Sequence, residues 1–268
     1  MAKSGKHRAQ KKQSRPKRRE GSGRTGHDDA PLWIYGRHAV AAVLKNPKRR
    51  VIRAMATKNG LDWLGGQNVP SAVIDLIDDA KPDQLDATLP AGAVHQGVAA
   101  LTHDLPRARL KEICAEPGAS SCVVVLDQIT DPQNIGAIFR SAAAFGASAI
   151  IAQDRRTPPL SGALAKAAVG AVETIPCIRV VNVARALEAL RDQGFFCAGL
   201  TGDADALIND IPNGKPLAIV VGAEGAGLRR LVGATCDGLF KIPINSDIES
   251  LNVSTATAIA LYSARQKR

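Results

Sequence analysis

The second half of the chain alternates short, β-branched apolar runs with longer amphipathic patterns, and this alternation limits the choice of fold. From residue 122 onward the apolar runs predict strands at 122–126, 147–152, 174–180, 195–200, 217–221 and 239–244. Helical periodicity falls between them, at about 135–145, 160–169, 183–193, 228–234 and 250–265. Buried strands separated by helices of roughly 10 to 15 residues indicate a parallel sheet with helices on both faces. The sequence therefore predicts an α/β domain over residues 122–268.

The residues before this domain divide into three segments. Residues 31–105 show the patterns of a small α/β unit, with an apolar start at 32–35 and a strand-like end at 97–101. Residues 106–121 are charged and contain two prolines and a glycine, which favours a linker. Residues 1–30 contain almost no apolar side chains that could offset the entropy of ordering, so we predict a disordered tail.

Positive charge is concentrated in this tail. Residues 1–27 contain ten lysines and arginines against one acid, Glu20, whereas the other 241 residues carry 25 bases and 24 acids. Each Lys or Arg placed on a phosphate releases condensed counterions, so the tail favours binding to a polyanion. Nucleic acid is the favoured partner, and an acidic membrane surface or plain solubility is the alternative.

Composition argues against several other classes of protein. No apolar stretch reaches the roughly 18 residues of a membrane helix and none follows the basic residues as in a signal peptide, so we expect a cytoplasmic protein without membrane attachment. Aromatic residues make up only 3% of the chain, which disfavours base-stacking platforms. Neither disulfides nor a zinc site is suggested by the cysteines, which are odd in number and form no C-x-x-C pair: Cys114, Cys122, Cys177, Cys197 and Cys236.

Polar residues follow the first predicted strand of the large domain, at the end where ligands of such sheets bind. Asn134 is placed to cap the next helix at its N-terminus, and Arg140 comes almost two turns later. On their own, these two residues are better explained by an ordinary capped helix with a solvated arginine.

The loop after the predicted strand at 217–221 is rich in glycine. Its order, from Gly222 to Gly227, is G-x-x-G-x-G, which differs from the G-x-G-x-x-G of dinucleotide-binding folds. It also lacks the Gly-Lys-Ser or Gly-Lys-Thr of a phosphate-binding loop. A tight turn that presses its backbone against a ligand and a simple turn explain the pattern equally well.

A third polar stretch, 242–256, leads from a predicted strand into the last predicted helix. Ser250, Asn252 and Ser254 place three short polar side chains at the helix start, where one capping residue would be enough. The small residues that follow keep this helix slim, as expected where another helix packs closely against it.

In this order and at this spacing, the three stretches closely resemble the three motifs of the SpoU family of RNA ribose 2′-O-methyltransferases, within the SPOUT superfamily. The resemblance covers residues 122–268 and is greatest to the type that methylates guanosine in 23S rRNA. A weaker resemblance covers residues 32–101. There, WIYGRHAV at 33–40 and HQGVA at 95–99 are similar to the two ends of the family's RNA substrate-binding domain.

The resemblance implies a deep trefoil knot in the C-terminal sheet, a homodimer, and S-adenosylmethionine as the cofactor. The family has a glycine in the loop that here reads NSD at 245–247, so the backbone of this loop is expected to differ. The positions that match the family's cofactor-binding residues offer backbone N–H and C=O groups rather than side-chain chemistry. These positions are Leu200, Thr201, Gly222, Ile242 and Leu251.

The resemblance also implies a set of functional side chains: Asn134, Arg140, Glu224, Ser250 and Asn252, with Ser254 beside them. Arg140 would act on the ribose 2′-hydroxyl, by passing on its proton or by positioning it. Positioning is favoured, because a guanidinium is almost never neutral and methyl transfer depends on in-line approach. Asn134 would hold Arg140 and the ribose, and Glu224 would offset the positive charge. Ser250 and Asn252 would fix the loop and the cofactor, and the reaction needs no metal.

By this resemblance, the expected reaction is S-adenosylmethionine-dependent 2′-O-methylation of a ribose, with guanosine and large-subunit ribosomal RNA favoured. The basic tail and the small domain would then grip the RNA. A methyltransferase that acts on tRNA is the nearer alternative, because the same motifs serve both substrates. A non-catalytic RNA-binding knot protein is the more distant one.

Overall fold

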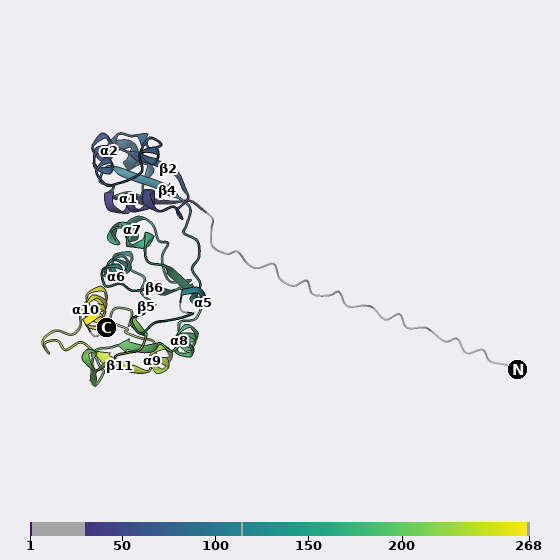
Figure 1. Cartoon of the computed structure of the whole chain (residues 1–268), viewed down its shortest axis with the longest axis vertical. Coiled ribbons are helices and arrows are strands. Elements are labelled where there is room, and N and C mark those ends of the chain that lie inside the picture. Colours follow the sequence, from purple (N-terminus) through teal and green to yellow (C-terminus); the bar gives the residue numbers. More distant parts are fainter. Residues whose placement is uncertain (2–29, 114, 267–268) are drawn as a thin grey trace.

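The computed structural model describes Met1 and residues 30–113 and 115–266 of the 268-residue chain. The predicted disorder of the tail, residues 1–30, falls outside the described residues except at the two ends of that segment. Two sheets of different size organise the rest of the chain (Figure 1). No helix in the described ranges is long and apolar enough to cross a membrane.

The N-terminal sheet is small and mixed. Its strands are β1 (Leu32–Tyr35), β2 (Val51–Ala56), β3 (Asp78–Asp79) and β4 (Val98–Thr102), in the order β1-β4-β2-β3. β4 runs antiparallel to β1 and β2, and β3 is parallel to β2. The helices of this unit are α1 (Arg37–Lys45), α2 (Lys58–Gly65), α3 (Ser71–Ile74) and α4 (Pro82–Thr88). The short helix α5 (Leu110–Ile113) lies in the connection to the second sheet.

The C-terminal sheet has seven parallel strands, in the order β7-β6-β5-β10-β8-β11-β9. The strands are β5 (Cys122–Asp127), β6 (Ala149–Gln153), β7 (Cys177–Val180), β8 (Phe196–Leu200), β9 (Ala206–Leu207), β10 (Leu217–Gly222) and β11 (Gly238–Lys241). The prediction of an α/β fold with a parallel sheet is confirmed. The six predicted strands are present, and the two-residue β9 is an addition.

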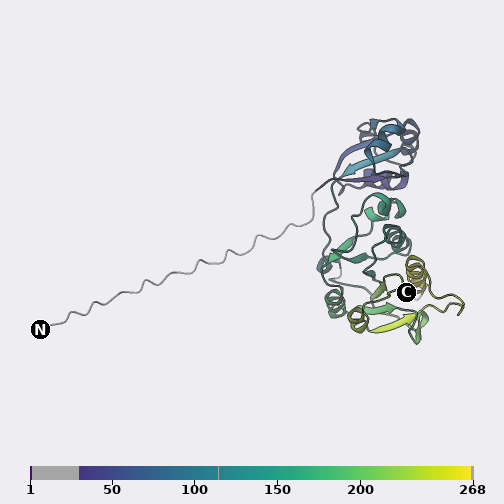
Figure 2. The same ribbon diagram turned by 180° about the vertical axis from the view of Figure 1, so that it is seen from behind.

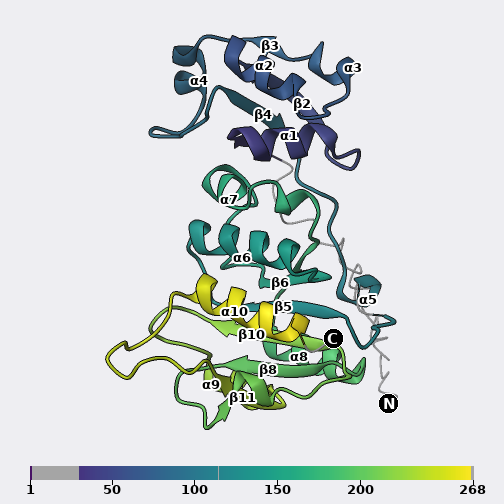
Figure 3. The same cartoon turned by 60° about the vertical axis from the view of Figure 1, so that its left-hand side comes forward.

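Helices cover both faces of this sheet, because alternate strand residues point to opposite sides. One core cluster joins the sheet to α6 (Pro132–Ala144), α7 (Gly162–Ala167) and α10 (Val253–Gln266). The other joins the opposite face to α8 (Val183–Asp192) and α9 (Arg230–Thr235). The short helices η1 (Ala171–Glu173) and η2 (Ile208–Asp210) complete the domain. In Figure 3, α6 and α10 lie on the side of the sheet that faces the small domain.

The small domain packs directly on the large one through α7 and η1, and the view from behind in Figure 2 shows the same stacking. A buried ion pair crosses this contact: Arg49 Nε donates to Glu173 Oε2 at 3.1 Å, and the two side chains are 0% and 4% exposed. Asn46 Nδ2 donates to the same oxygen at 2.8 Å, and Arg49 Nη1 donates to the carbonyl oxygen of His103 at 3.0 Å. The two sheets are therefore held together by buried charge as well as by apolar contact.

Two sequence predictions about helix ends are wrong. Asp131, not Asn134, caps α6, since its carboxylate accepts the N–H of Asn134 at 2.8 Å. Pro132 is suited to the first helical position because it has no N–H to satisfy, so the cap is the residue before it, three residues before Asn134. The last helix begins at Val253 rather than at Ser250, because Asn252 accepts the N–H groups of Ser254 and Thr255.

Candidate active site

Three loops of the large domain meet at one edge of its sheet. They follow β5, β10 and β11, and since all strands are parallel, their carboxyl ends share that edge. The loop after β11 is long, and residues 243–250 are all exposed to solvent. In Figure 3 this connection projects from the side of the molecule between β11 and α10.

A hydrogen-bonded cluster joins one side chain from each loop. Glu224 Oε1 accepts from Asn134 Nδ2 at 3.0 Å and from Asn252 Nδ2 at 2.9 Å. Asn252 Nδ2 also donates to Asn134 Oδ1 at 2.9 Å, which closes the triangle. Asn252 Oδ1 accepts the hydroxyl of Ser254 at 2.6 Å, so the start of α10 is fixed to the same cluster. Residues that are up to 118 positions apart thus form one polar surface that solvent and ligands can reach.

The glycine loop after β10 turns back tightly on itself. Gly227 N donates to the carbonyl oxygen of Ala223 at 2.9 Å, and both Gly225 (φ 75°) and Gly227 (φ 63°) have left-handed backbones. A Cβ on Gly222 would overlap the backbone carbonyl of Gly227. Glycine is therefore required here by the turn itself, which then aims Glu224 at the cluster.

A buried carboxylate anchors the far end of the same loop. Asp127 is the last residue of β5 and its side chain is 0% exposed. Its Oδ2 accepts the N–H of Arg229 at 2.9 Å, and its Oδ1 accepts Arg229 Nε at 2.7 Å. Neither residue was predicted from the sequence to have a role. A charged residue at the end of an otherwise apolar strand is the signal that could have found Asp127, because buried charges need a partner.

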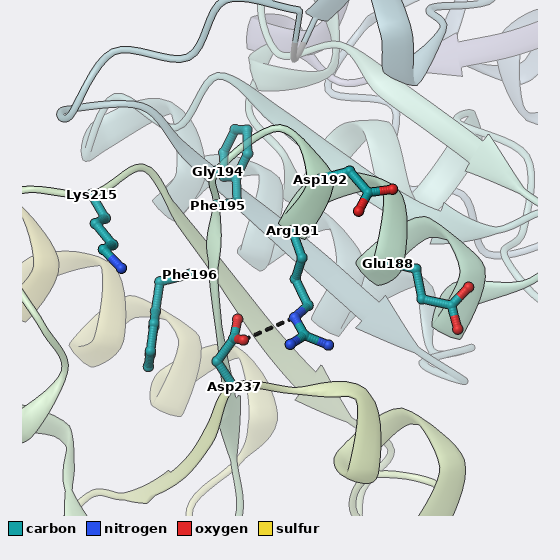
Figure 4. Close-up of a pocket in the computed structure, with 8 residues that line it drawn as sticks. All are labelled: Glu188, Arg191, Asp192, Gly194, Phe195, Phe196, Lys215 and Asp237. Carbon is teal, nitrogen blue, oxygen red and sulfur yellow. Dashed lines mark ion pairs between the residues drawn. The ribbon is translucent and has the colours of Figure 1, made fainter.

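An open hollow of about 480 Å³ lies at the opposite edge of the sheet (Figure 4). It is lined by charged residues of α8 and by the residues that precede β8, β10 and β11. Asp237 is satisfied within the fold, by Arg191 Nε at 2.8 Å and by the N–H of Cys197 at 2.8 Å. Because ligands of parallel sheets bind beyond the carboxyl ends of strands, the three-loop cluster is the better candidate site.

Comparison with known proteins shows which family this chain is similar to. The model of the SpoU rRNA Methylase family matches residues 121–262. The 23S rRNA (guanosine-2′-O-)-methyltransferase RlmB of Vibrio parahaemolyticus is 37% identical over 249 residues, covering 88% of this chain and 97% of the relative. That of Photobacterium profundum is 40% identical over 247 residues, covering the same shares.

This chain belongs to the SpoU rRNA methylase family. Among solved structures, an rRNA methyltransferase from Sinorhizobium meliloti has a TM-score of 0.73 at 25% identity, covering 89% of this chain and 88% of the other. The structure of an rRNA methyltransferase from the same organism with AdoMet bound has a TM-score of 0.72 at 24% identity, covering 88% and 87%. The resemblance seen in the sequence is confirmed.

Two side chains that the SpoU motifs implied do not join the cluster. Arg140 is exposed and forms no hydrogen bond or ion pair with any residue in the described ranges. The expected contact between Asn134 and Arg140 is absent, because six residues along an α-helix turn the side chain by about 240°. Ser250 lies in the exposed loop, and it is Ser254 that contacts Asn252.

The positions that match the SpoU cofactor loops lie at the ends of adjacent strands. Leu200 ends β8 and Gly222 ends β10, while Ile242 directly follows β11. Leu200 and Ile242 are half-buried and pack against the main core. The N–H of Thr201 donates to the carbonyl oxygen of Phe240 at 3.0 Å, so it serves the fold. Leu251 is half-buried next to Asn252. Apolar side chains with a glycine beside them suit the flat face of an adenine whose polar edge bonds to backbone N–H and C=O groups.

Proposed function

We propose that this chain transfers the methyl group of S-adenosylmethionine to the ribose 2′-hydroxyl of a guanosine in 23S rRNA. The observation that carries the proposal is the cluster of Asn134, Glu224 and Asn252, which joins the three SpoU motifs at the carboxyl edge of the sheet. The guanosine and the 23S rRNA follow from the relatives, which match this chain over both of its sheets. An rRNA substrate also fits the cytoplasmic location expected from the sequence.

The geometry of the cluster suggests how the work is divided. S-adenosylmethionine supplies a methyl group on a sulfonium, which an oxygen must approach in line. Leu200, Gly222, Ile242 and Leu251 would hold its adenine. Glu224 Oε1 is occupied by the two amide donors, and Oε2 accepts no bond from the described residues, so Oε2 is available to a hydroxyl of a ligand. We therefore assign to Glu224 the orientation of a ligand; it has no hydrogen bond to Arg140.

Arg140 is proposed to act across a homodimer. On its own subunit Arg140 lies on a different side of α6 from Asn134. Its guanidinium can therefore reach a cluster of Asn134, Glu224 and Asn252 only if that cluster belongs to a second copy of the chain. The outer face of α10 supports such a pairing, because Ile259 and Tyr262 are exposed there, at 36% and 53%. The trefoil knot is part of the same proposal, with the exposed loop 243–250 as the segment that the knot involves.

A transfer assay tests the proposed function. The purified protein is incubated with methyl-labelled S-adenosylmethionine and with total RNA from cells that lack 2′-O-methylation, and the RNA is separated by size. Label in the large ribosomal RNA supports the proposal. Label in tRNA would favour the tRNA alternative. Failure of the protein to bind S-adenosylmethionine would favour the non-catalytic alternative.

The role of Arg140 has a test of its own. Arg140→Ala should lower kcat by about 10²-fold or more, the usual loss for one electrostatic contact to the transition state, and leave the affinity for S-adenosylmethionine unchanged. Arg185→Ala is the matched control, because Arg185 is an exposed arginine on the opposite face of the sheet. Turnover by Arg140→Ala within twofold of the wild type would contradict the role.

A further inference from the structure

The small domain contains an open polar hollow of about 430 Å³. The sheet topology explains its position: β4 is antiparallel to β1 and β2, so the residues before β4 lie beside those that follow the other two strands. A volume in the lower part of the small-ligand range suits one nucleotide rather than a duplex. Its walls are formed by Arg37, Thr57, Asn59, Pro82, His95, Gln96 and Gly97.

Hydrogen bonds hold the wall of this hollow in a fixed shape. The backbone N–H of Arg37 donates to Gln96 Oε1 at 3.1 Å, and Arg37 Nε donates to the carbonyl oxygen of Gln96 at 3.3 Å. The guanidinium of Arg37 also lies over the ring of Trp63, 5.6 Å from its centroid. Gln96 has a left-handed backbone (φ 55°), which a residue other than glycine adopts only at a cost. This strained segment is held in place by its neighbours, as is common at binding sites.

The rim of the hollow is basic. Lys58 lies between two of the lining residues, and Lys81 directly precedes Pro82. Lys166 comes from α7 of the large domain, and its Cγ is 3.1 Å from where a Cβ on Gly36 would stand. Nearby acids are fewer. Asp86 pairs with His95 Nε2 at 3.2 Å, and Asp83 follows Pro82.

These features match the chemistry of single-stranded RNA. Proteins read RNA sequence mostly on unstacked bases, with side chains that bond base edges and with planar arginine groups. The amides of Asn59 and Gln96 offer both donors and acceptors, and the rim lysines offer charge to phosphates. In Figure 3 the connection from α4 to β4, which carries His95 and Gln96, projects from the same side of the molecule as the exposed loop between β11 and α10.

We propose that this hollow binds one unpaired nucleotide of the RNA, at a distance from the methylated ribose that the packing of the two domains fixes. The base contacts Asn59 and Gln96, and the flanking phosphates contact Arg37, Lys58 and Lys166. The assignment of this nucleotide to the substrate rests on the proposed function, whereas the binding of single-stranded RNA does not.

The test fills the hollow and leaves its charge unchanged. Asn59→Trp places a large ring in the hollow, and Asn59→Ala removes the amide. Asn59 is exposed in the first turn of α2 and its side chain makes no hydrogen bond with the described residues, so both variants should fold. Gln67→Ala, just beyond the other end of α2, is the matched control.

Affinity is measured by fluorescence anisotropy with a fluorescein-labelled single-stranded RNA of mixed sequence and with the same RNA as a duplex. We expect Asn59→Trp to bind the single strand about tenfold more weakly, with the duplex and the control unchanged. In methyl transfer to a 23S rRNA transcript, the KM should rise by a similar factor and kcat should stay within twofold. Equal affinity of both variants and wild type for the single strand would overturn the proposal. So would a loss of affinity for the duplex as large as the loss for the single strand. A protein that methylates no RNA but loses single-strand affinity on Asn59→Trp would refute the proposed function alone.

Discussion

The ion pair between Arg49 and Glu173 gives the most quantitative test of how the two domains are joined. Glu173→Ala removes a carboxylate that accepts from two Arg49 nitrogens and from Asn46, and leaves a guanidinium that is 0% exposed. What remains for Arg49 is the carbonyl oxygen of His103 at 3.0 Å and the half-exposed Asp104 at 3.9 Å. Removing one partner of a buried pair costs about 3–5 kcal/mol. The stability lost in Glu173→Ala cannot exceed the free energy needed to separate the two domains, because once they separate Arg49 is returned to water.

Both tryptophans of the chain, Trp33 and Trp63, lie in the small domain, so their fluorescence reports on that domain in a urea titration. A loss of about 3 kcal/mol, at a slope of about 1–3 kcal/mol per molar, lowers the midpoint by roughly 1–3 M. Glu188→Ala, at an exposed glutamate of α8, should leave it unchanged.

A double variant separates charge from packing. Arg49→Met combined with Glu173→Leu replaces the pair by apolar side chains and should recover most of the loss, since apolar replacements of buried pairs are often neutral. A midpoint of Glu173→Ala within about 0.3 M of the wild type would refute the reasoning, because a pair so cheaply removed is not buried between the domains in solution.

Three further outcomes are expected. Gly222→Ala should destabilise the protein by about 1–3 kcal/mol in urea unfolding, because its Cβ meets backbone, whereas Gly233→Ala, with open space around it, should be neutral or stabilising; equal effects would contradict the close approach. Asn252→Ala removes the two hydrogen bonds that the side-chain amide donates and the cap of α10. It should lower kcat/KM by about tenfold in the transfer assay and the free energy of unfolding by about 0.5–2 kcal/mol. Full activity would show that the cluster is not catalytic. Burial raises the pKa of Cys177 from 9.0 to about 11, so its contribution to stability is complete below pH 9 and is lost as the pH rises from 9 to 11; Cys177→Ala should flatten this fall in the urea midpoint.

Much of the fold could be predicted because the large sheet is buried on both faces. Its strands are continuous apolar runs, such as the fully buried β5, and turn residues separate them from the helices. The prediction was weakest where tertiary contacts decide local structure. The two-residue β9 has no pattern of its own, and the cap of α6 depended on which residue stood beside Pro132.

The candidate site was predictable only in part. Asn134, Glu224 and Asn252 came from the resemblance, since each motif alone had an ordinary explanation, and their hydrogen bonds join loops that the sequence does not show to be close. The pairs that hold the site and the domains in place span 102 positions for Asp127 and Arg229 and 124 for Arg49 and Glu173. Periodicity and spacing carry no signal for such pairs.

The identity of the methylated nucleoside decides whether this chain is a guanosine 2′-O-methyltransferase. Unmethylated 23S rRNA is treated with the wild-type protein and S-adenosylmethionine, digested to nucleosides and analysed by mass spectrometry. We expect one new nucleoside, 2′-O-methylguanosine, at a yield approaching one per rRNA molecule. A methyl group on a base, or on the ribose of a nucleoside other than guanosine, would contradict it.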